Sequence, residues 1–197
     1  MKVALALGAV VAVVAGCDGA DQRFTKADAM RIAGVQPAAP GWAWPRNAGK
    51  PAWSSASASS GSSEPALAEF RRKTASVISV GEADKRWQDA DKLANLDVGV
   101  YGSASDAHKA LAPFNTLTRT LAARAGRILD AGPVDGIGAE TWRLRVAGNG
   151  PQVTYHWRRG NLVVEAHVHC FGRCPADADA AARTWVDAID AAAQARS

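Results

Sequence analysis

Large apolar residues recur at every second position in three consecutive runs of the C-terminal third of the chain. The runs are Trp142, Leu144 and Val146, then Val153, Tyr155 and Trp157, then Leu162, Val164, Ala166 and Val168. A period of two is typical of β-strands that bury one face. Glycine- and asparagine-containing segments at 148–151 and 160–161 separate the runs and have turn chemistry. The pattern therefore predicts an antiparallel meander of three strands.

The Gly160–Asn161 turn fixes the pairing of the last two strands. A two-residue hairpin turn here places His156 opposite Glu165, and Trp157 opposite Val164. We expect this register to keep every large apolar residue of the meander on one face, and to leave the other face polar and largely cationic.

The same kind of pattern predicts the remaining elements. Residues 76–80 and 96–101 read as strands, and a helix begins at Ser103 or Ser105 and extends to about residue 125, with Pro113 kinking or splitting it. Residues 175–196 form a closing helix in which Trp185 faces the sheet. Short helices are expected at 25–32 and 65–73. The expected fold is α+β: an antiparallel sheet of about five strands packed with two main helices, as a two-layer arrangement or an α/β/α sandwich.

The first residues have the pattern of an export signal. Lys2 supplies a positive start, and residues 3–15 are apolar apart from one glycine. Thirteen residues suit the apolar part of a signal peptide and are too few for a membrane-spanning helix, which needs about 20. Small residues, Ala15 and Gly16, then precede Cys17.

An apolar residue, two small residues and a cysteine together resemble the lipobox of bacterial lipoproteins. The resemblance implies cleavage before Cys17, acylation of its thiol and anchoring to the outer side of a membrane through the acyl chains. Asp18 resembles a retention signal for the inner membrane in some bacteria, so the choice of membrane stays open.

The chain divides into three predicted parts. Residues 1–16 are the signal peptide, 17–75 a lipid-anchored tether, and 76–197 the α+β domain. Trp42, Trp44 and Trp53 lie in the tether among prolines and serines. These rings either dock on the domain or form an apolar patch for a ligand or partner.

Composition and charge exclude some functions. Hydrophobic residues make up 48% of the chain, which is enough for a packed core. The net charge of +4 is spread over the sequence without long basic runs, so we expect no nucleic-acid partner. With Cys17 lipidated, Cys170 and Cys174 remain, and in an oxidising compartment we expect them to form a structural disulfide around the Gly-containing turn between them.

No sequence pattern of a nucleophile, metalloprotease or nucleotide-binding site is present, and we expect no catalytic residue and no cofactor. One cluster has metal-ligand chemistry: His156, His167, His169 and Glu165 fall on one predicted sheet face. The same face would carry Arg143, Arg145 and Arg158, which suit an anion or an acidic partner. The simplest interpretation is that these side chains are only the solvated or helix-covered face of a sheet.

The order of elements resembles two groups of known domains. The segments 98–103, 136–140 and 158–164, with the Ala-rich last helix, are similar to PsbP-like α/β/α sandwiches and to extracytoplasmic lipoprotein and kinase-sensor domains of actinobacteria. The resemblance implies a non-enzymatic binding or accessory module.

Three functions follow as hypotheses. The first is an envelope-anchored, non-catalytic domain that binds a protein or a small apolar ligand. The second is a metal-binding lipoprotein that uses the sheet histidines. The third, a hydrolase of the cell envelope, lacks a nucleophile–base pair in the sequence and would need a deep pocket with paired carboxylates.

Overall fold

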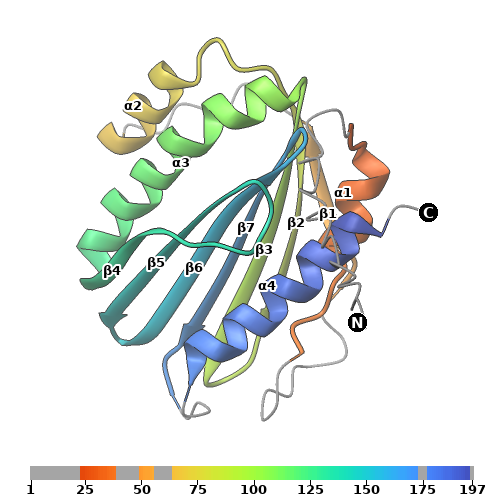
Figure 1. Ribbon diagram of the computed structural model, residues 1–197. Helices are drawn as coiled ribbons and strands as arrows, with labels where there is room; N and C mark the ends of the chain where they lie inside the picture. The colour runs from red at the N-terminus through yellow and green to blue at the C-terminus, as the bar shows by residue number, and fades with distance from the viewer. Residues whose placement is uncertain (1–22, 39–48, 56–63, 173–176, 196–197) are drawn as a thin grey trace, which may run out of the picture.

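The computed structural model describes residues 23–38, 49–55, 64–172 and 177–195, which form seven strands and four helices (Figure 1). All strand pairs are antiparallel, and the sheet order is β1-β2-β3-β7-β6-β5-β4. The strands are β1 (Ala52–Ser55), β2 (Ser79–Gln88), β3 (Lys92–Tyr101), β4 (Arg127–Pro133), β5 (Glu140–Gly148), β6 (Gly150–Arg159) and β7 (Leu162–Cys170). The predicted α+β class is confirmed.

The helices lie on both faces of the sheet, so the arrangement is the three-layer alternative (Figure 1). One face carries α1 (Lys26–Ala33) and α4 (Ala178–Gln194), and the other carries α3 (Ala104–Ala125). The remaining helix, α2 (Pro65–Lys73), packs on α3. Within the described residues, β1 and β4 add two strands to the expected five, and the short helices expected at 25–32 and 65–73 are present as α1 and α2.

The α1/α4 face holds the main core. Trp87, Trp157 and Trp185 are each at most 1% exposed, and the rings of Trp87 and Trp185 meet edge to face at 5.6 Å. Trp185 also donates a hydrogen bond through Nε1 to the carbonyl of Val35. Burying three indoles against a sheet supplies a large part of the apolar burial that a domain of this size needs. The expected anchoring by Trp185 is confirmed.

The residues before β2 are built into this core. Phe24, Ile32 and Ala33 are buried in the same cluster as the tryptophans. Asn161, in the β6–β7 turn, binds Phe24 through both backbone polar groups, at 2.6 Å to the amide and 3.1 Å to the carbonyl. The predicted boundary at residue 75 therefore does not separate tether from core, since residues from 24 onward pack with the sheet.

The helix starts follow the capping rules. Thr25 and Asp28 form the reciprocal hydrogen bonds of a capping box at the start of α1, and Ser103 caps α3 through the amide of Asp106. The expected helix around Pro113 is a single helix from Ala104 to Ala125, so it is not split.

The β6–β7 hairpin has the predicted register, with His156 opposite Glu165 and Trp157 opposite Val164. Gly160 at the turn has a φ of 53°, which a glycine adopts without strain. The register of β5 differs from the expectation. Trp142 lies opposite His156, on the α3 side of the sheet.

The prediction that all large apolar residues share one face was therefore wrong for β5. The tight turn that pairs Gly148 with Gly150 sets this register. Leu144 and Val146 of β5 are nonetheless buried, because the sheet has helices on both faces. Burial on both sides removes the need for a single apolar face.

Candidate functional site

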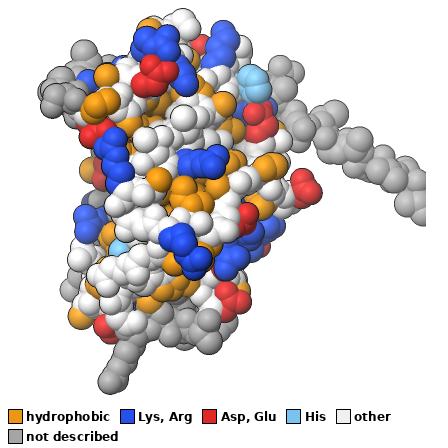
Figure 2. All heavy atoms as spheres, turned by 90° about the vertical axis from the view of Figure 1, so that its left-hand side faces the viewer, with side chains coloured by type: hydrophobic (Ala, Val, Ile, Leu, Met, Phe, Trp, Pro, Cys, Tyr) orange, Lys and Arg blue, Asp and Glu red, His pale blue; other side chains and the backbone are white. Residues whose placement is uncertain are grey.

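A cavity of about 490 Å³ lies between the sheet and the pair of helices α2 and α3. Its floor comes from β1, β2, β3 and β7, and its walls from α2, α3 and the segment before β2. Figure 2 shows the side of the molecule that carries α2 and α3, where hydrophobic side chains are exposed among acidic and basic ones. The lining residues are Ser54, Ser55, Phe70, Thr74, Val77, Ser79, Gly81, Glu82, Asp97, Gly99, Tyr101, Ala110, Phe114, Val163 and Glu165. The volume is in the range of sites for small molecules, about 300–1,000 Å³.

The alternation of strand β3 produces the hollow. Leu96, Val98 and Val100 point into the α1/α4 core and are buried, so the residues between them face the cavity. Gly99 contributes no side chain there, and a Cβ on it would lie 3.2 Å from the ring of Tyr101. The missing side chain leaves room for the ring of Tyr101 beside the strand.

Carboxyl groups form a row across this floor. Asp97 of β3 pairs with Asp84 of β2 on one side and with Glu165 of β7 on the other. Side chains directly opposite each other in an antiparallel pair have Cβ atoms about 4.5–5.5 Å apart. Glu82 lies opposite Gly99, two residues along the strand from Asp97, and also lines the cavity.

This crowding changes the acidity of Asp97. Burial, followed by the charges of Glu165, Glu82 and Asp84, raises the pKa of Asp97 to about 8. Burial and the charges of Glu165 and Asp84 also raise the pKa of Glu82, which keeps solvent contact. At neutral pH, Asp97 is therefore mostly protonated.

Glu165 differs because a histidine binds it. His156 of β6 is fully buried, and its Nε2 lies 2.8 Å from a carboxylate oxygen of Glu165. Burial favours a higher pKa for Glu165, but the hydrogen bond and the charge of His156, with that of His167, outweigh it and the pKa is lowered. Glu165 thus stays ionised beside a protonated Asp97.

His156 has a partner at each ring nitrogen. Its Nδ1 lies 2.7 Å from Oδ1 of Asn115 on α3, and its ring lies between those of Phe114, at 4.6 Å, and Trp142, at 5.5 Å. Phe114 lines the acidic cavity, whereas Asn115 and Trp142 line a second hollow of about 500 Å³ between α3 and the β4–β5 connection. His156 therefore forms part of the wall between the two hollows.

The other predicted metal ligands have separate partners. His167 Nδ1 lies 2.9 Å from the hydroxyl of Thr154, and His169 Nε2 lies 2.8 Å from the carbonyl of Asn149. Burial lowers the pKa of His167 to about 4, so its ring is neutral. Within the described residues, no three His, Cys, Asp or Glu side chains come together as a ligand set.

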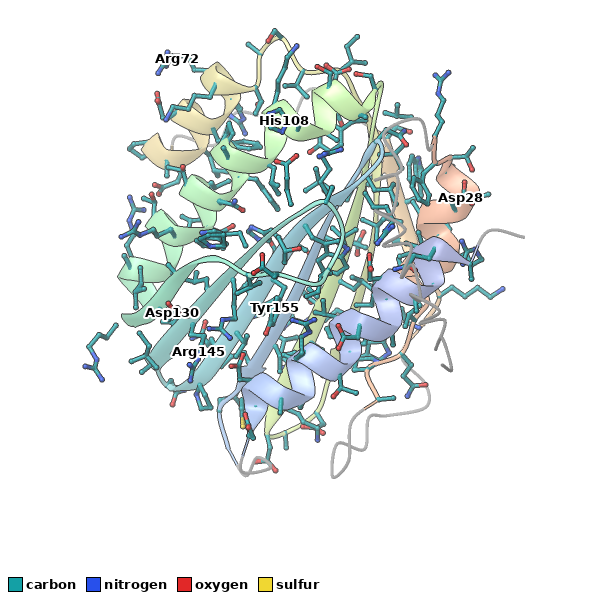
Figure 3. The ribbon with its side chains drawn as sticks, viewed as in Figure 1. Asp28, Arg72, His108, Asp130, Arg145 and Tyr155 are labelled. Carbon is teal, nitrogen blue, oxygen red and sulfur yellow. The ribbon has the colours of Figure 1, made fainter. Side chains whose placement is uncertain are left out.

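The predicted arginine surface is divided between the two faces of the sheet. Arg143 binds Asp130 at 2.7 Å and Asp179 of α4 at 3.2 Å, and Arg145 lies 3.9 Å from Asp179. Arg158 lies on the α3 side, where it binds Glu140 at 2.8 Å. Figure 3 shows Arg145 and Asp130 side by side near one end of the sheet. The three arginines do not form one surface.

The remaining predicted site residues are cysteines and tryptophans. Cys17, Trp42, Trp44 and Cys174 lie outside the described residues, so the anchor and the pairing of Cys170 with Cys174 stay predictions. Trp53 lies in β1, where it packs against the main core and has Lys26 Nζ 5.3 Å from its ring. For this one tryptophan, docking on the domain is the alternative that applies.

The acidic floor was missed at the level of sequence. Asp97 belongs to the predicted strand at residues 96–101, and its alternation with buried residues was visible. Its pairing with β7 was not visible, because β3 and β7 are more than 60 residues apart and only the fold makes them neighbours. The part of β2 that carries Glu82 and Asp84 lies beyond the predicted strand at 76–80.

Among the helices of the described residues, none combines the length and the apolar character needed to cross a membrane.

The sequence matches no protein-family model and no curated protein. Among solved structures, the fold is similar to that of the extracellular domain of PknH from Mycobacterium tuberculosis. That similarity has a TM-score of 0.44 at 15% identity, over 73% of this chain and 84% of that chain.

Proposed function

We propose that this chain is a membrane-anchored, extracytoplasmic binding protein without catalytic activity, and that its ligand site is the acidic cavity between the sheet and α2–α3. The observation that carries the proposal is the cavity itself. It has the volume of a small-molecule site, mostly apolar walls and a few polar groups on its floor. This combination is typical of binding pockets.

The anchor is supported by the signal pattern that ends at Cys17. Mass spectrometry of the membrane-extracted protein tests it. We expect an N-terminal acylated Cys17 in the native chain, and an unprocessed, unacylated chain after Cys17→Ser. An intact start methionine on the native protein would contradict the anchor and the compartment together.

Filling the cavity tests the binding site. Thr74, the C-cap of α2, lines the cavity and is only partly buried, so Thr74→Trp can occupy the space without displacing the core. Ala123→Trp, at an exposed position of α3, is the matched control. Equilibrium dialysis of 2-phenylethanol against the processed chain in lipid nanodiscs, with empty nanodiscs as reference, measures the site. We expect binding to the native chain and the control, and its loss in Thr74→Trp.

A hydrolase is the second candidate, because the cavity holds the paired carboxylates that such an enzyme would need. Asp97 and Glu165 lie opposite each other, and their pKa values shift in opposite directions, as in an acid and a base. Binding is favoured because His156 already occupies the Glu165 carboxylate.

Turnover of 4-methylumbelliferyl glycosides decides between the two functions. We expect none above the level of Asp97→Asn. Hydrolysis by the native chain that Asp97→Asn abolishes would replace the binding function with a catalytic one.

A further inference from the structure

The charge balance of the cavity narrows the kind of ligand it can hold. Among its described lining residues three are carboxylic acids, and none is lysine or arginine. Glu165 is already bound by His156. Asp97 and Glu82 form neither an ion pair nor a side-chain hydrogen bond with any described residue. Two acids thus line the cavity without a positive partner.

The neighbours of Asp97 add to the shortage of positive charge in the cavity. The titratable groups that face it are Glu82 and Asp84 from β2, Glu165 and His167 from β7, and His156 behind Glu165. No described lining residue of α2 or α3 titrates. A carboxyl group removed from water and surrounded by like charges favours its neutral form until a cation arrives.

The walls of the cavity favour a ligand that has an apolar part. Phe70 of α2 and Phe114 of α3 lie with ring centroids 6.0 Å apart, and both line the cavity. Val77, Ala110 and Val163 complete the apolar wall. The ring of Tyr101 lines the same space, and aromatic faces attract ammonium groups as well as hydrocarbon.

Resting on the cavity as the binding site, we propose that its ligand is a small organic cation, an ammonium group joined to an apolar body. The ammonium lies beside Asp97 and Glu82, and the apolar body packs between the rings of Phe70 and Phe114. The cation restores the charge balance of the floor, and its three N–H donors match the free carboxyl oxygens. Asp97 releases its proton to the solvent when the ammonium binds.

Three probes share a phenyl ring and differ in the charge of their end group: 2-phenylethylamine, 2-phenylethanol and 3-phenylpropanoate. Equilibrium dialysis against the processed chain in nanodiscs gives the three affinities, with empty nanodiscs as reference. We expect the amine to bind at least about tenfold more tightly than the alcohol, because hydrogen bonds to charged groups contribute more than neutral ones. The carboxylate should bind most weakly. In Asp97→Asn the advantage of the amine is lost and the alcohol is unchanged, whereas Asp187→Asn, an exposed carboxylate on α4, changes neither.

The dependence on pH gives a second readout. Because Asp97 must be ionised to hold the ammonium, the affinity for the amine should rise by up to about tenfold per pH unit between pH 6 and 8. The affinity for the alcohol should stay constant. In Asp97→Asn the amine should lose this rise.

The outcomes separate the two proposals. Equal binding of amine and alcohol would overturn the cationic ligand and leave the cavity as a binding site. Tighter binding of the carboxylate would also overturn it, because a protonated Asp97 would then be the donor to an anion. If none of the probes binds, the cavity function fails and the cationic ligand fails with it.

Discussion

The two faces of the sheet differ in their side chains: one face is packed with apolar groups, and the other carries carboxyl groups. On the α1/α4 face, indole rings and aliphatic side chains fill the space and exclude water. On the α3 face, the half of the sheet formed by β1, β2, β3 and β7 carries carboxyl groups beneath a hollow. Neighbouring residues of a strand point to opposite faces, so Val98 stabilises the fold while Asp97, next to it, costs stability. Charged groups kept at such a cost are typical of functional sites.

Truncation of Trp185 should produce the largest change in stability among the variants that test this comparison. Its side chain is 1% exposed and meets Trp87, so Trp185→Ala leaves a void and frees the carbonyl of Val35. We expect the free energy of unfolding to fall by about 3–5 kcal/mol in denaturant titration. Phe70→Ala, at the partly buried cavity wall, should cost less than half as much. Equal losses would mean that the cavity face is packed as firmly as the core.

Asn161→Ala should produce the next largest effect. This side chain is 3% exposed and bonds Phe24 twice and the carbonyl of Tyr101 once, at 2.8 Å. Removing it breaks these three hydrogen bonds to backbone groups, so we expect a loss of about 2–4 kcal/mol.

The measurement for Asn161→Ala is thermal or denaturant unfolding followed by tryptophan fluorescence. Asn149→Ala, at an exposed turn, is the control and should be near neutral. If Asn161→Ala were equally harmless, the segment that begins at residue 24 would not be needed by the sheet, and the domain would begin later, near the predicted boundary at residue 76.

How well the sequence predicts each face depends on how far apart in the chain the interacting residues lie. The β6–β7 hairpin, the C-terminal helix and the anchoring role of Trp185 follow from local periodicity and turn chemistry, and all were predicted. The short edge strand β1 and the strand β4 carry little alternation, and they exist because the sheet offers them a partner.

The candidate site was only half visible in the sequence. Glu165 and His156 were placed opposite each other correctly, because one turn separates them. Asp97 reaches Glu165 through pairing between β3 and β7, and this pairing depends on the whole topology of the sheet. Arg143 and Arg158 were assigned to one face because the one-residue difference in the register of β5 could not be read from its pattern.

Asp97→Asn should change stability in the opposite direction from the core variants. The pKa of Asp97 rises from an ordinary value near 4 to about 8 in the folded chain. Between these values the folded state holds more protons than the unfolded state, so the stability of the native chain falls as the pH rises from 5 to 8, by up to about 1.4 kcal/mol per pH unit. Asp97→Asn lacks this loss and should be the more stable protein at pH 8.

Denaturant titrations at pH 5, 6, 7 and 8 measure the difference between the native chain and Asp97→Asn. Asp187→Asn, at an exposed position on α4, should follow the native curve. Parallel curves for the native chain and Asp97→Asn would show that the floor of the cavity is as well solvated as the surface.

Zinc should have the smallest effect of all, because His156 is already satisfied. Its two ring nitrogens face Glu165 and Asn115, and its ring is enclosed by Phe114 and Trp142. A metal that used His156, His167 and Glu165 together would have to break both hydrogen bonds of a fully buried ring. With a dissociation constant of 1 μM, 100 μM zinc would stabilise the fold by about 2.7 kcal/mol. We expect a gain of less than about 0.4 kcal/mol, which corresponds to a dissociation constant of 100 μM or weaker.

Thermal unfolding with and without zinc, repeated in His167→Ala, measures this gain in stability. A zinc-dependent gain above 2 kcal/mol that His167→Ala removes would make the α3 face a metal site and assign its carboxyl groups to coordination rather than to an ammonium ligand.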